Sequence, residues 1–167
     1  MSQRHRRYSL KSKEAKQIIT HASEKLKVNL GKVFTSKDNV EAVETDFGQL
    51  LLIKGKPLLF RTGNDVFPTL LAGDVLAQVP KVIVDMGAVR FVCNGADVMA
   101  PGIVRYEGEF GKGDIVVVAD VKYCKPLAIG EILYSITDAK NTKQGAIVKN
   151  IHYVSDKVWN FVKTFSE

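Results

Sequence analysis

The 167-residue sequence has little that would anchor it in a membrane or cross-link it covalently. Its apolar runs are short, with Ile115–Ala119 typical of the longest, whereas a membrane-spanning helix needs about 20 apolar residues in a row. No apolar segment follows the basic N-terminus, so a secretory signal peptide is not predicted. Cys93 and Cys124 lack the spacing of a metal site, and we expect both to be free, buried thiols. These absences favour a soluble, cytoplasmic protein.

The sequence also lacks the motifs of common enzyme and cofactor sites. Gly111–Gly113 has no third glycine and no strand-to-helix setting, as a dinucleotide-binding loop requires. Neither HxE nor CxxC metal spacing occurs in the N-terminal half. His5 and His21 lie near no plausible nucleophile or carboxylate pair. We therefore expect no catalytic residue, no metal and no cofactor, and only a catalytic site assembled from scattered side chains stays open.

What the chain does have is an ordinary globular composition with an uneven distribution of charge. It is 46% hydrophobic and 25% charged, and its length allows one domain or two small ones. Residues 1–37 hold ten lysines and arginines against two acidic residues, a net charge of +8, whereas the remainder is close to neutral. This basic arm, with Arg4, Arg6, Arg7 and Lys11 at its start, predicts attraction to phosphate backbones or anionic surfaces. The alternative is a frayed, solvated terminus.

Residues 1–78 have the pattern of a small α+β domain. Ser12 can cap a helix whose apolar positions repeat at helical spacing from Ala15 to Leu26. A meander of short strands follows, separated by glycine-containing turns, and a short helix is expected after it. The predicted strands are Val40–Thr45, Leu50–Lys54 and Leu58–Thr62, and the predicted short helix is Pro68–Ala72.

Residues 79–167, beyond a boundary at Gln78–Pro80, have the closely spaced strands of a compact barrel. The predicted strands are Val82–Val84, Ile103–Tyr106, Ile115–Val121, Ile129–Ile136 and Ala146–Val154, with a short helix at Ala88–Cys93 and turns at Gly111–Gly113 and Asp138–Thr142. Ser155–Asp156 can cap a last helix, and we expect its Trp159, Phe161 and Val162 to close the barrel.

Several segments of this second half resemble the PUA domain, an RNA-binding pseudobarrel. They are Val84–Ala88, Gly95–Ile103, Gly113–Val118 and Ala128–Gly130. The ending Asn150–Tyr153, followed by Asp156 and Trp159, is similar to the translation-associated family of the malignant-T-cell-amplified-sequence protein and its archaeal relatives. The resemblance implies an α+β chain, with a small N-terminal α+β domain over 1–78 and a C-terminal PUA-type β pseudobarrel over 79–167.

The loop Asn94–Gly102 is the predicted RNA site. Its glycines permit close approach of a backbone or base, and Met99 could pack on a base face. The resemblance implies that the groove beside it takes a single-stranded 3′ end or a stem–loop junction, often of tRNA. The candidate RNA-binding residues are Arg90, Asn94, Gly95, Ala96, Asp97, Met99, Pro101, Gly102, Lys122 and Lys125. The alternatives are that the glycines serve barrel turns only and that both lysines belong to a solvated turn. His152 is interpreted as a structural histidine.

Three functions are left open by these patterns. The first is a non-catalytic, translation-associated RNA-binding protein that engages a tRNA acceptor end, the small ribosomal subunit or both, with a translation-factor partner. The second is an accessory subunit that presents RNA to a separate modifying enzyme. The third is a small-molecule-binding or interaction barrel.

Overall fold

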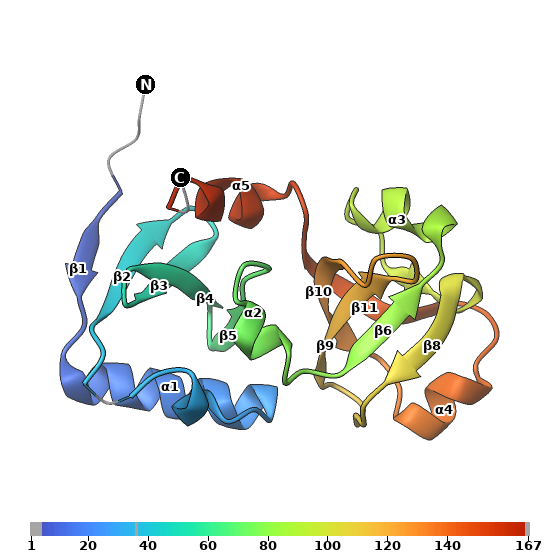
Figure 1. Cartoon of the computed structure of the whole chain (residues 1–167), viewed down its shortest axis with the longest axis horizontal. Helices are drawn as coiled ribbons and strands as arrows, with labels where there is room; N and C mark the ends of the chain where they lie inside the picture. The colour runs from blue at the N-terminus through green and yellow to red at the C-terminus, as the bar shows by residue number, and fades with distance from the viewer. Residues whose placement is uncertain (1–4, 36, 166–167) are drawn as a thin grey trace.

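Two sheets, formed by successive parts of the chain, lie side by side in the protein (Figure 1). The computed structural model describes residues 5–35 and 37–165, so Arg4 of the predicted arm lies outside the described residues. No helix of this described part is long and apolar enough to span a membrane. The α+β class is confirmed.

The first sheet is an antiparallel meander in the order β1-β2-β3-β4-β5. Its strands are β1 (Arg7–Ser9), β2 (Val40–Thr45), β3 (Gly48–Ile53), β4 (Lys56–Thr62) and β5 (Asp65–Pro68). Helix α1 (Ser12–Leu26) buries Ala15, Ile18, Ala22 and Leu26, as its spacing predicts, and the short η1 (Leu30–Lys32) follows it. The predicted helix and three-strand meander are therefore confirmed, whereas β1 lies within the segment interpreted as an arm.

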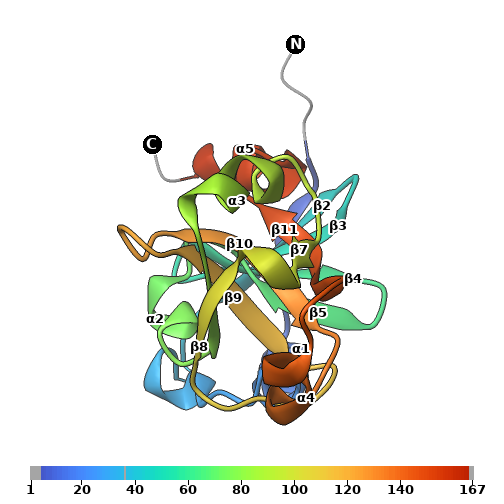
Figure 2. The ribbon, with the colours of Figure 1, turned by 90° about the vertical axis from the view of Figure 1, so that its right-hand side faces the viewer.

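The second sheet has the order β7-β11-β10-β9-β6-β8, with β6 and β9 parallel and the other pairs antiparallel. Register shifts along β6, β10 and β11 curl the sheet into a half-barrel. Figure 2 looks onto this unit, with α3 at one end and α4 at the other. The elements are β6 (Lys81–Val84), α3 (Met86–Val92), β7 (Val98–Met99), η2 (Ala100–Gly102), β8 (Ile103–Glu107), β9 (Ile115–Asp120), β10 (Pro126–Ile132), α4 (Ile136–Asn141), β11 (Ala146–Tyr153) and α5 (Lys157–Lys163).

Three predicted elements are wrong in length, position or type. The predicted strand Ile129–Ile136 ends earlier, since β10 stops at Ile132 and Ile136 is the first residue of α4. The short helix is α2 (Gly73–Leu76) and not Pro68–Ala72, because Pro68 still pairs with Leu59 in the sheet. All of the predicted turn Asp138–Thr142 except its last residue belongs to helix α4, which begins where the Ser135 hydroxyl accepts a hydrogen bond from the Asp138 N–H.

The last helix does not close the barrel, which corrects the role expected for Trp159, Phe161 and Val162. Helix α5 runs back over the first sheet (Figure 1), and these side chains pack with the core of the N-terminal unit. The Phe161 ring makes edge contacts with Phe47 and His5, with ring centroids 5.9 and 4.7 Å apart. The prediction failed because the chain returns to the N-terminal unit after β11. The periodicity of a helix shows which of its faces is apolar, and it does not show which unit that face packs against.

Candidate nucleic-acid interface

A groove lies between α3 and the segment from β7 to η2, where the predicted RNA site falls. Helix α3 begins at Met86 because the Asp85 carboxylate accepts a hydrogen bond from the Ala88 N–H, 2.9 Å away. The groove has a volume of about 390 Å³. Its lining is Asp85, Gly87, Ala88, Phe91, Val92, Ala96, Asp97, Val98, Met99, Pro101 and Gly102.

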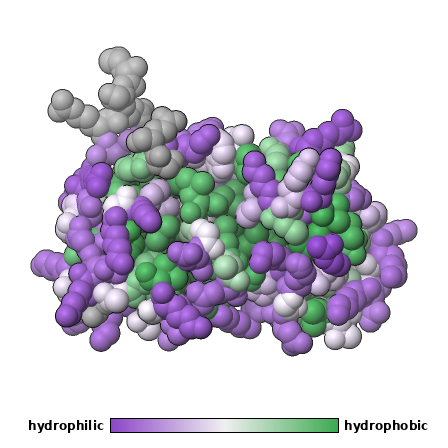
Figure 3. Space-filling model, in the orientation of Figure 1, coloured by the Kyte–Doolittle hydropathy of each residue, from purple (hydrophilic) through white to green (hydrophobic). Residues whose placement is uncertain are grey.

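Large apolar side chains stand open to solvent around this groove. Phe91 is 54% exposed, Met99 50% and Met86 44%. The Arg90 guanidinium lies over the Phe91 ring, 4.8 Å from its centroid, so a cation and an aromatic face are offered together. Hydrophobic surface appears at the right-hand end of the molecule in Figure 3, within hydrophilic surroundings. Exposed apolar patches of this kind mark binding surfaces.

Hydrogen bonds hold the far wall of the groove in place. The Asn150 side-chain amide donates to the carbonyls of Val92 and Ala96, both at 3.0 Å. The Asn150 N–H donates to the Asp97 carboxylate at 2.9 Å. Gly102 allows η2 to approach α3, because a Cβ there would stand 3.3 Å from that of Ala88. The groove is therefore fixed before any ligand arrives.

The structure brings together only part of the predicted site. Ala96, Asp97, Met99, Pro101 and Gly102 line the groove, and Arg90 stands at its rim. Asn94 and Gly95 do not line it.

Gly95 has a structural reason for being glycine. Its φ is +94°, and a Cβ there would lie 3.1 Å from the Tyr153 ring. The open side of this glycine therefore faces a tyrosine of the same chain, where the sequence interpretation places a nucleotide.

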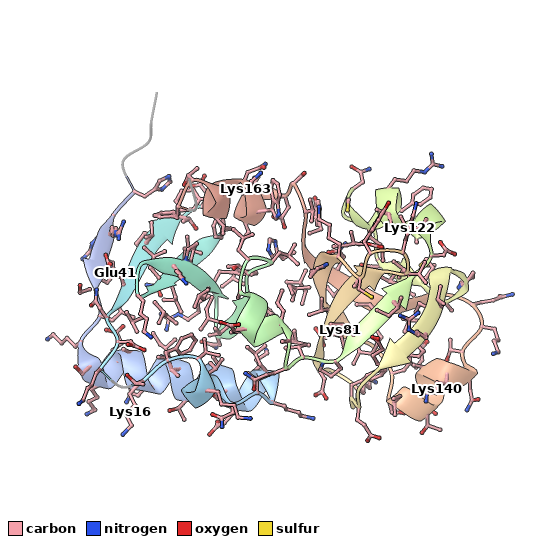
Figure 4. All side chains as sticks on the ribbon, viewed as in Figure 1. Lys16, Glu41, Lys81, Lys122, Lys140 and Lys163 are labelled. Atoms are coloured by element: carbon pink, nitrogen blue, oxygen red, sulfur yellow. The ribbon has the colours of Figure 1, made fainter. Side chains whose placement is uncertain are left out.

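Lys122 and Lys125 belong to the β9–β10 turn, a second exposed site near α3. The Lys122 ammonium lies 5.1 Å from the centroid of the Tyr123 ring, which is 69% exposed (Figure 4). The hydrogen bond from the Tyr123 N–H, with another from the Lys125 N–H, lowers the pKa of Asp120 below its ordinary value. The ionised Asp120 thereby fixes the turn that presents these side chains.

The two thiols differ from the expectation that both are buried. Cys93, at the end of α3, is half-buried, and burial raises its pKa while the positive charge of Lys125 opposes the rise. Cys124 is exposed, with φ +51°, because it occupies the tight β9–β10 turn.

The basic arm is partly engaged within the fold. Arg7 forms a two-pronged ion pair with Glu41 on β2, at 2.6 and 3.1 Å. That hydrogen bond raises the pKa of Arg7 and lowers that of Glu41. Arg6 lies 4.8 Å from the centroid of the Tyr8 ring, and Lys11 is exposed just before α1. Part of the arm is thus the edge strand β1, in which the charge of Arg7 is paired with that of Glu41.

His152 is a structural histidine, as interpreted from the sequence. It is fully buried, and its Nε2 accepts a hydrogen bond from the Leu70 N–H at 3.2 Å. Its Nδ1 donates to the Asp156 carboxylate at 2.8 Å. Because Leu70 belongs to the N-terminal unit, this ring links the two units.

Phe91 and Tyr123 are the surface residues that sequence reasoning missed. Helix α3 has apolar residues on more than one face, at Met86, Val89, Phe91 and Val92, which is more than one buried face needs. That excess was the available signal for Phe91. Tyr123 stands in a turn between two lysines, which is a basic segment with an aromatic residue inside it.

In the described residues no group of three or more histidine, cysteine, aspartate or glutamate side chains is placed to hold a metal ion.

The curled sheet, the helix α3 at its end and the groove between α3 and η2 together define the class of this protein: it is a PUA-domain protein. Residues 80–154 match the PUA domain family, and residues 6–72 match a domain of unknown function (DUF1947). A PUA domain implies RNA binding.

Relatives cover nearly the whole chain. It is 38% identical to an uncharacterized protein of Methanocaldococcus jannaschii, over 93% of this chain and 96% of that protein. It is 30% identical to translation machinery-associated protein 20 of Saccharomyces cerevisiae, over 92% and 86% of the two chains. Identity to malignant T-cell-amplified sequence 2 of Homo sapiens is 30%, over 81% and 78%. The chain belongs to the family that these three proteins represent.

Solved structures with the same fold also cover nearly the whole chain. A hypothetical protein from the archaeon Pyrococcus horikoshii, 36% identical, has a TM-score of 0.82 over 94% of this chain and 99% of its own. A PUA-domain protein from Aeropyrum pernix, solved as a tartrate complex, has a TM-score of 0.87 over 98% and 94% of the chains. At 23% identity, the second comparison shows the fold alone.

Proposed function

We propose that this protein is a non-catalytic RNA-binding protein of the cytoplasm that acts in translation and holds the single-stranded acceptor end of a tRNA in the groove beside α3. One observation carries the proposal: a preformed apolar groove with Phe91 and Met99 open to solvent and Arg90 at the rim. Translation-associated relatives support the cellular role.

The chemistry of the groove suits unpaired nucleotides. Proteins bind single-stranded RNA by stacking bases on aromatic or guanidinium planes, and a base in a duplex does not offer its face. Phe91 and Arg90 present such planes beside a hollow of about 390 Å³. The acceptor end of tRNA is a free single strand of this kind.

Contact with the small ribosomal subunit is the second part of the proposal. Exposed cations on the N-terminal unit support it: Arg6, Lys11, Lys13 and Lys16. Lys11 directly precedes α1, and Lys13 and Lys16 lie on its first turns with the exposed Glu14 between them. Figure 4 labels Lys16 at the end of the molecule away from the groove. Such a patch attracts ribosomal RNA through its phosphates. A translation-factor partner would bind surface outside the groove and this basic patch.

The test compares apolar truncations inside and outside the groove. Phe91→Ala and Met99→Ala remove exposed side chains at the groove, and Leu71→Ala removes one that is 41% exposed on the N-terminal unit. Binding to a tRNA acceptor mimic with a free 3′ end should weaken by about 1–3 kcal/mol for Phe91→Ala. Leu71→Ala should bind like the parent, and a blunt duplex should bind all four proteins alike.

Equal binding of the acceptor mimic by the parent and both groove variants would overturn the proposal. Copurification with an RNA-modifying enzyme, without ribosome cosedimentation, would favour an accessory RNA-presenting subunit. A parent protein that binds no RNA at low salt would point to a small-molecule-binding or interaction barrel.

A further inference from the structure

A second, cationic groove lies on the other side of η2 from the apolar groove beside α3. This second groove, between β8 and α4, has a volume of about 550 Å³. Its lining is Ala100, Pro101, Ile103, Val104, Arg105, Tyr106, Ala139, Lys140, Thr142 and Lys143. Pro101 lines both grooves, so η2 lies between them. Figure 2 shows β8 running between the ends that α3 and α4 occupy.

The charges of the two grooves differ. The carboxylates beside the first groove are engaged, because Asp85 caps α3 and Asp97 accepts from the Asn150 N–H. Three cations line the second groove, one from β8 and two from α4 and the residues after it: Arg105, Lys140 and Lys143. No acidic residue is among its lining residues in the described part of the chain.

These cations are poorly neutralised. The Arg105 Nε lies 3.8 Å from a Glu107 carboxylate oxygen, and both side chains are more than a third exposed, so this pair is weak. Within the described residues, Lys140 and Lys143 form no ion pair. Figure 4 places Lys140 on α4, at the opposite end of the unit from α3. The groove therefore holds free positive charge beside an apolar surface that includes Val104, which is 50% exposed.

We propose that the β8–α4 groove is a phosphate-binding subsite, and that a single strand of RNA crosses η2 from the base-stacking groove into it. This inference rests on the proposed function and extends it, because it assigns a path for more than the terminal nucleotide. Single-strand sites combine stacking platforms with a cationic track for the backbone, and the two grooves supply one each. The cations contact phosphates, so this subsite adds affinity without sequence preference.

The experiment pairs a groove variant with a charge-matched control. Arg105→Gln, Lys140→Gln and Lys143→Gln are combined in one protein, and Lys32→Gln, Lys56→Gln and Lys112→Gln in another. The control lysines are exposed and form no ion pair within the described residues. Each protein replaces three cations, so both lose the same net charge. Melting temperatures are measured first, and exposed substitutions of this kind leave folding intact. Each protein is then titrated with a single-stranded trinucleotide and with a strand of about eight nucleotides.

For the longer strand, the plot of log affinity against log salt concentration should be shallower for the groove variant than for the parent, by about 2 in slope. Each lost phosphate contact lowers the slope by about 0.7, and the variant loses three cations. The control should keep the parent slope, and the trinucleotide should bind both variants alike.

If the parent and a Phe91→Ala variant differ as expected but the groove variant matches its control, the subsite is wrong and the proposed function stands. If the parent binds neither strand, the proposed function itself fails. A groove variant that binds RNA like the control but no longer cosediments with ribosomes would assign the groove to a protein and overturn the inference.

Discussion

At the scale of single residues, the glycine at position 95 separates fold from function. It lies in the predicted RNA loop, yet its positive φ and the nearby Tyr153 ring both explain it without RNA. Its neighbours in the chain, Ala96 and Asp97, do line the groove. One loop therefore contains positions that shape the fold and positions that face a ligand.

Gly95→Ala should destabilise the protein more than Gly113→Ala. Gly113 has φ +91°, close to the +94° of Gly95, but a Cβ there meets nothing within 4 Å. Gly113→Ala should therefore cost only the backbone strain, about 1–2 kcal/mol. Gly95→Ala adds a clash at 3.1 Å with Tyr153, and combining it with Tyr153→Ala should remove the excess. Equal losses of unfolding free energy in the two single variants would show that the tyrosine contact has no effect.

Asp156 joins a helix cap to the buried histidine. Its carboxylate accepts hydrogen bonds from the Trp159 N–H at 2.8 Å, the Tyr153 N–H at 2.9 Å and the His152 ring at 2.8 Å. Burial alone raises the pKa of this carboxyl, but the hydrogen bonds, that of His152 foremost, outweigh burial and hold the pKa below its ordinary value.

A lowered pKa in the folded state gives a defined pH dependence. The stabilisation from Asp156 is fully present above the unfolded pKa of about 3.9, and it is lost as the pH falls through the lower folded pKa. Asp156→Asn should therefore be less stable than the parent at neutral pH, and the difference in unfolding free energy should shrink in acid. Urea unfolding of both proteins from neutral pH down to the acid range measures this. A difference that stays constant with pH would contradict the account.

At the scale of elements, the sequence patterns predicted the helices and strands whose formation depends on residues close together in the chain. Helix α1 and strands β2 to β4 were predicted because their periodicity and turns are local. The misplaced helix α2 and the missed helix α4 are only four and six residues long, too short for periodicity to settle. Strands β1 and β7 have three and two residues and exist through pairing with β2 and β11, which are distant in sequence. Helix α5 likewise packs against the N-terminal unit, which is distant from it in sequence.

Helix α5 gives the element-scale prediction. The barrel has its own hydrophobic cluster, whereas Val158 and Val162 of α5 belong to the cluster of the N-terminal unit. A fragment of residues 79–167 should fold its strands and show dispersed amide resonances, as the boundary predicted at Gln78–Pro80 implies. Its α5 amides, however, should exchange with solvent far faster than in the full chain, because their packing partners are absent. Protected α5 amides, or poor dispersion throughout the fragment, would contradict this division.

At the scale of the whole molecule, the two units share more than a linker. Ile115, Val117 and Ile129 of the barrel belong to the same hydrophobic cluster as the N-terminal core. His152 and the ion pair of Lys27 with Asp114, at 2.9 Å, join the units elsewhere. The basic N-terminal surface and the groove beside α3 are therefore held in a fixed relation, which suits a protein that contacts a large RNA assembly and a smaller RNA at once.

The candidate site was predictable to the extent that it follows a motif. The loop motif predicted five residues that line the groove, and the predicted helix before the loop supplied Arg90, which stands at its rim. Phe91 was missed because its exposure depends on how α3 packs on the barrel. Asn150 was missed because its side-chain hydrogen bonds reach residues in α3 and the following loop that are more than 50 positions away in the sequence. The cationic side chains of β8 and α4 meet only in the folded barrel.

The most direct test of the central claim is to map the contact surface of a tRNA acceptor-end mimic by amide chemical-shift changes in the full chain. The account predicts the largest changes in α3 and η2, around Phe91 and Met99, with further changes along β8 and α4 as the single strand is lengthened. Changes confined to the N-terminal unit, with α3 and η2 unaffected at saturation, would contradict it.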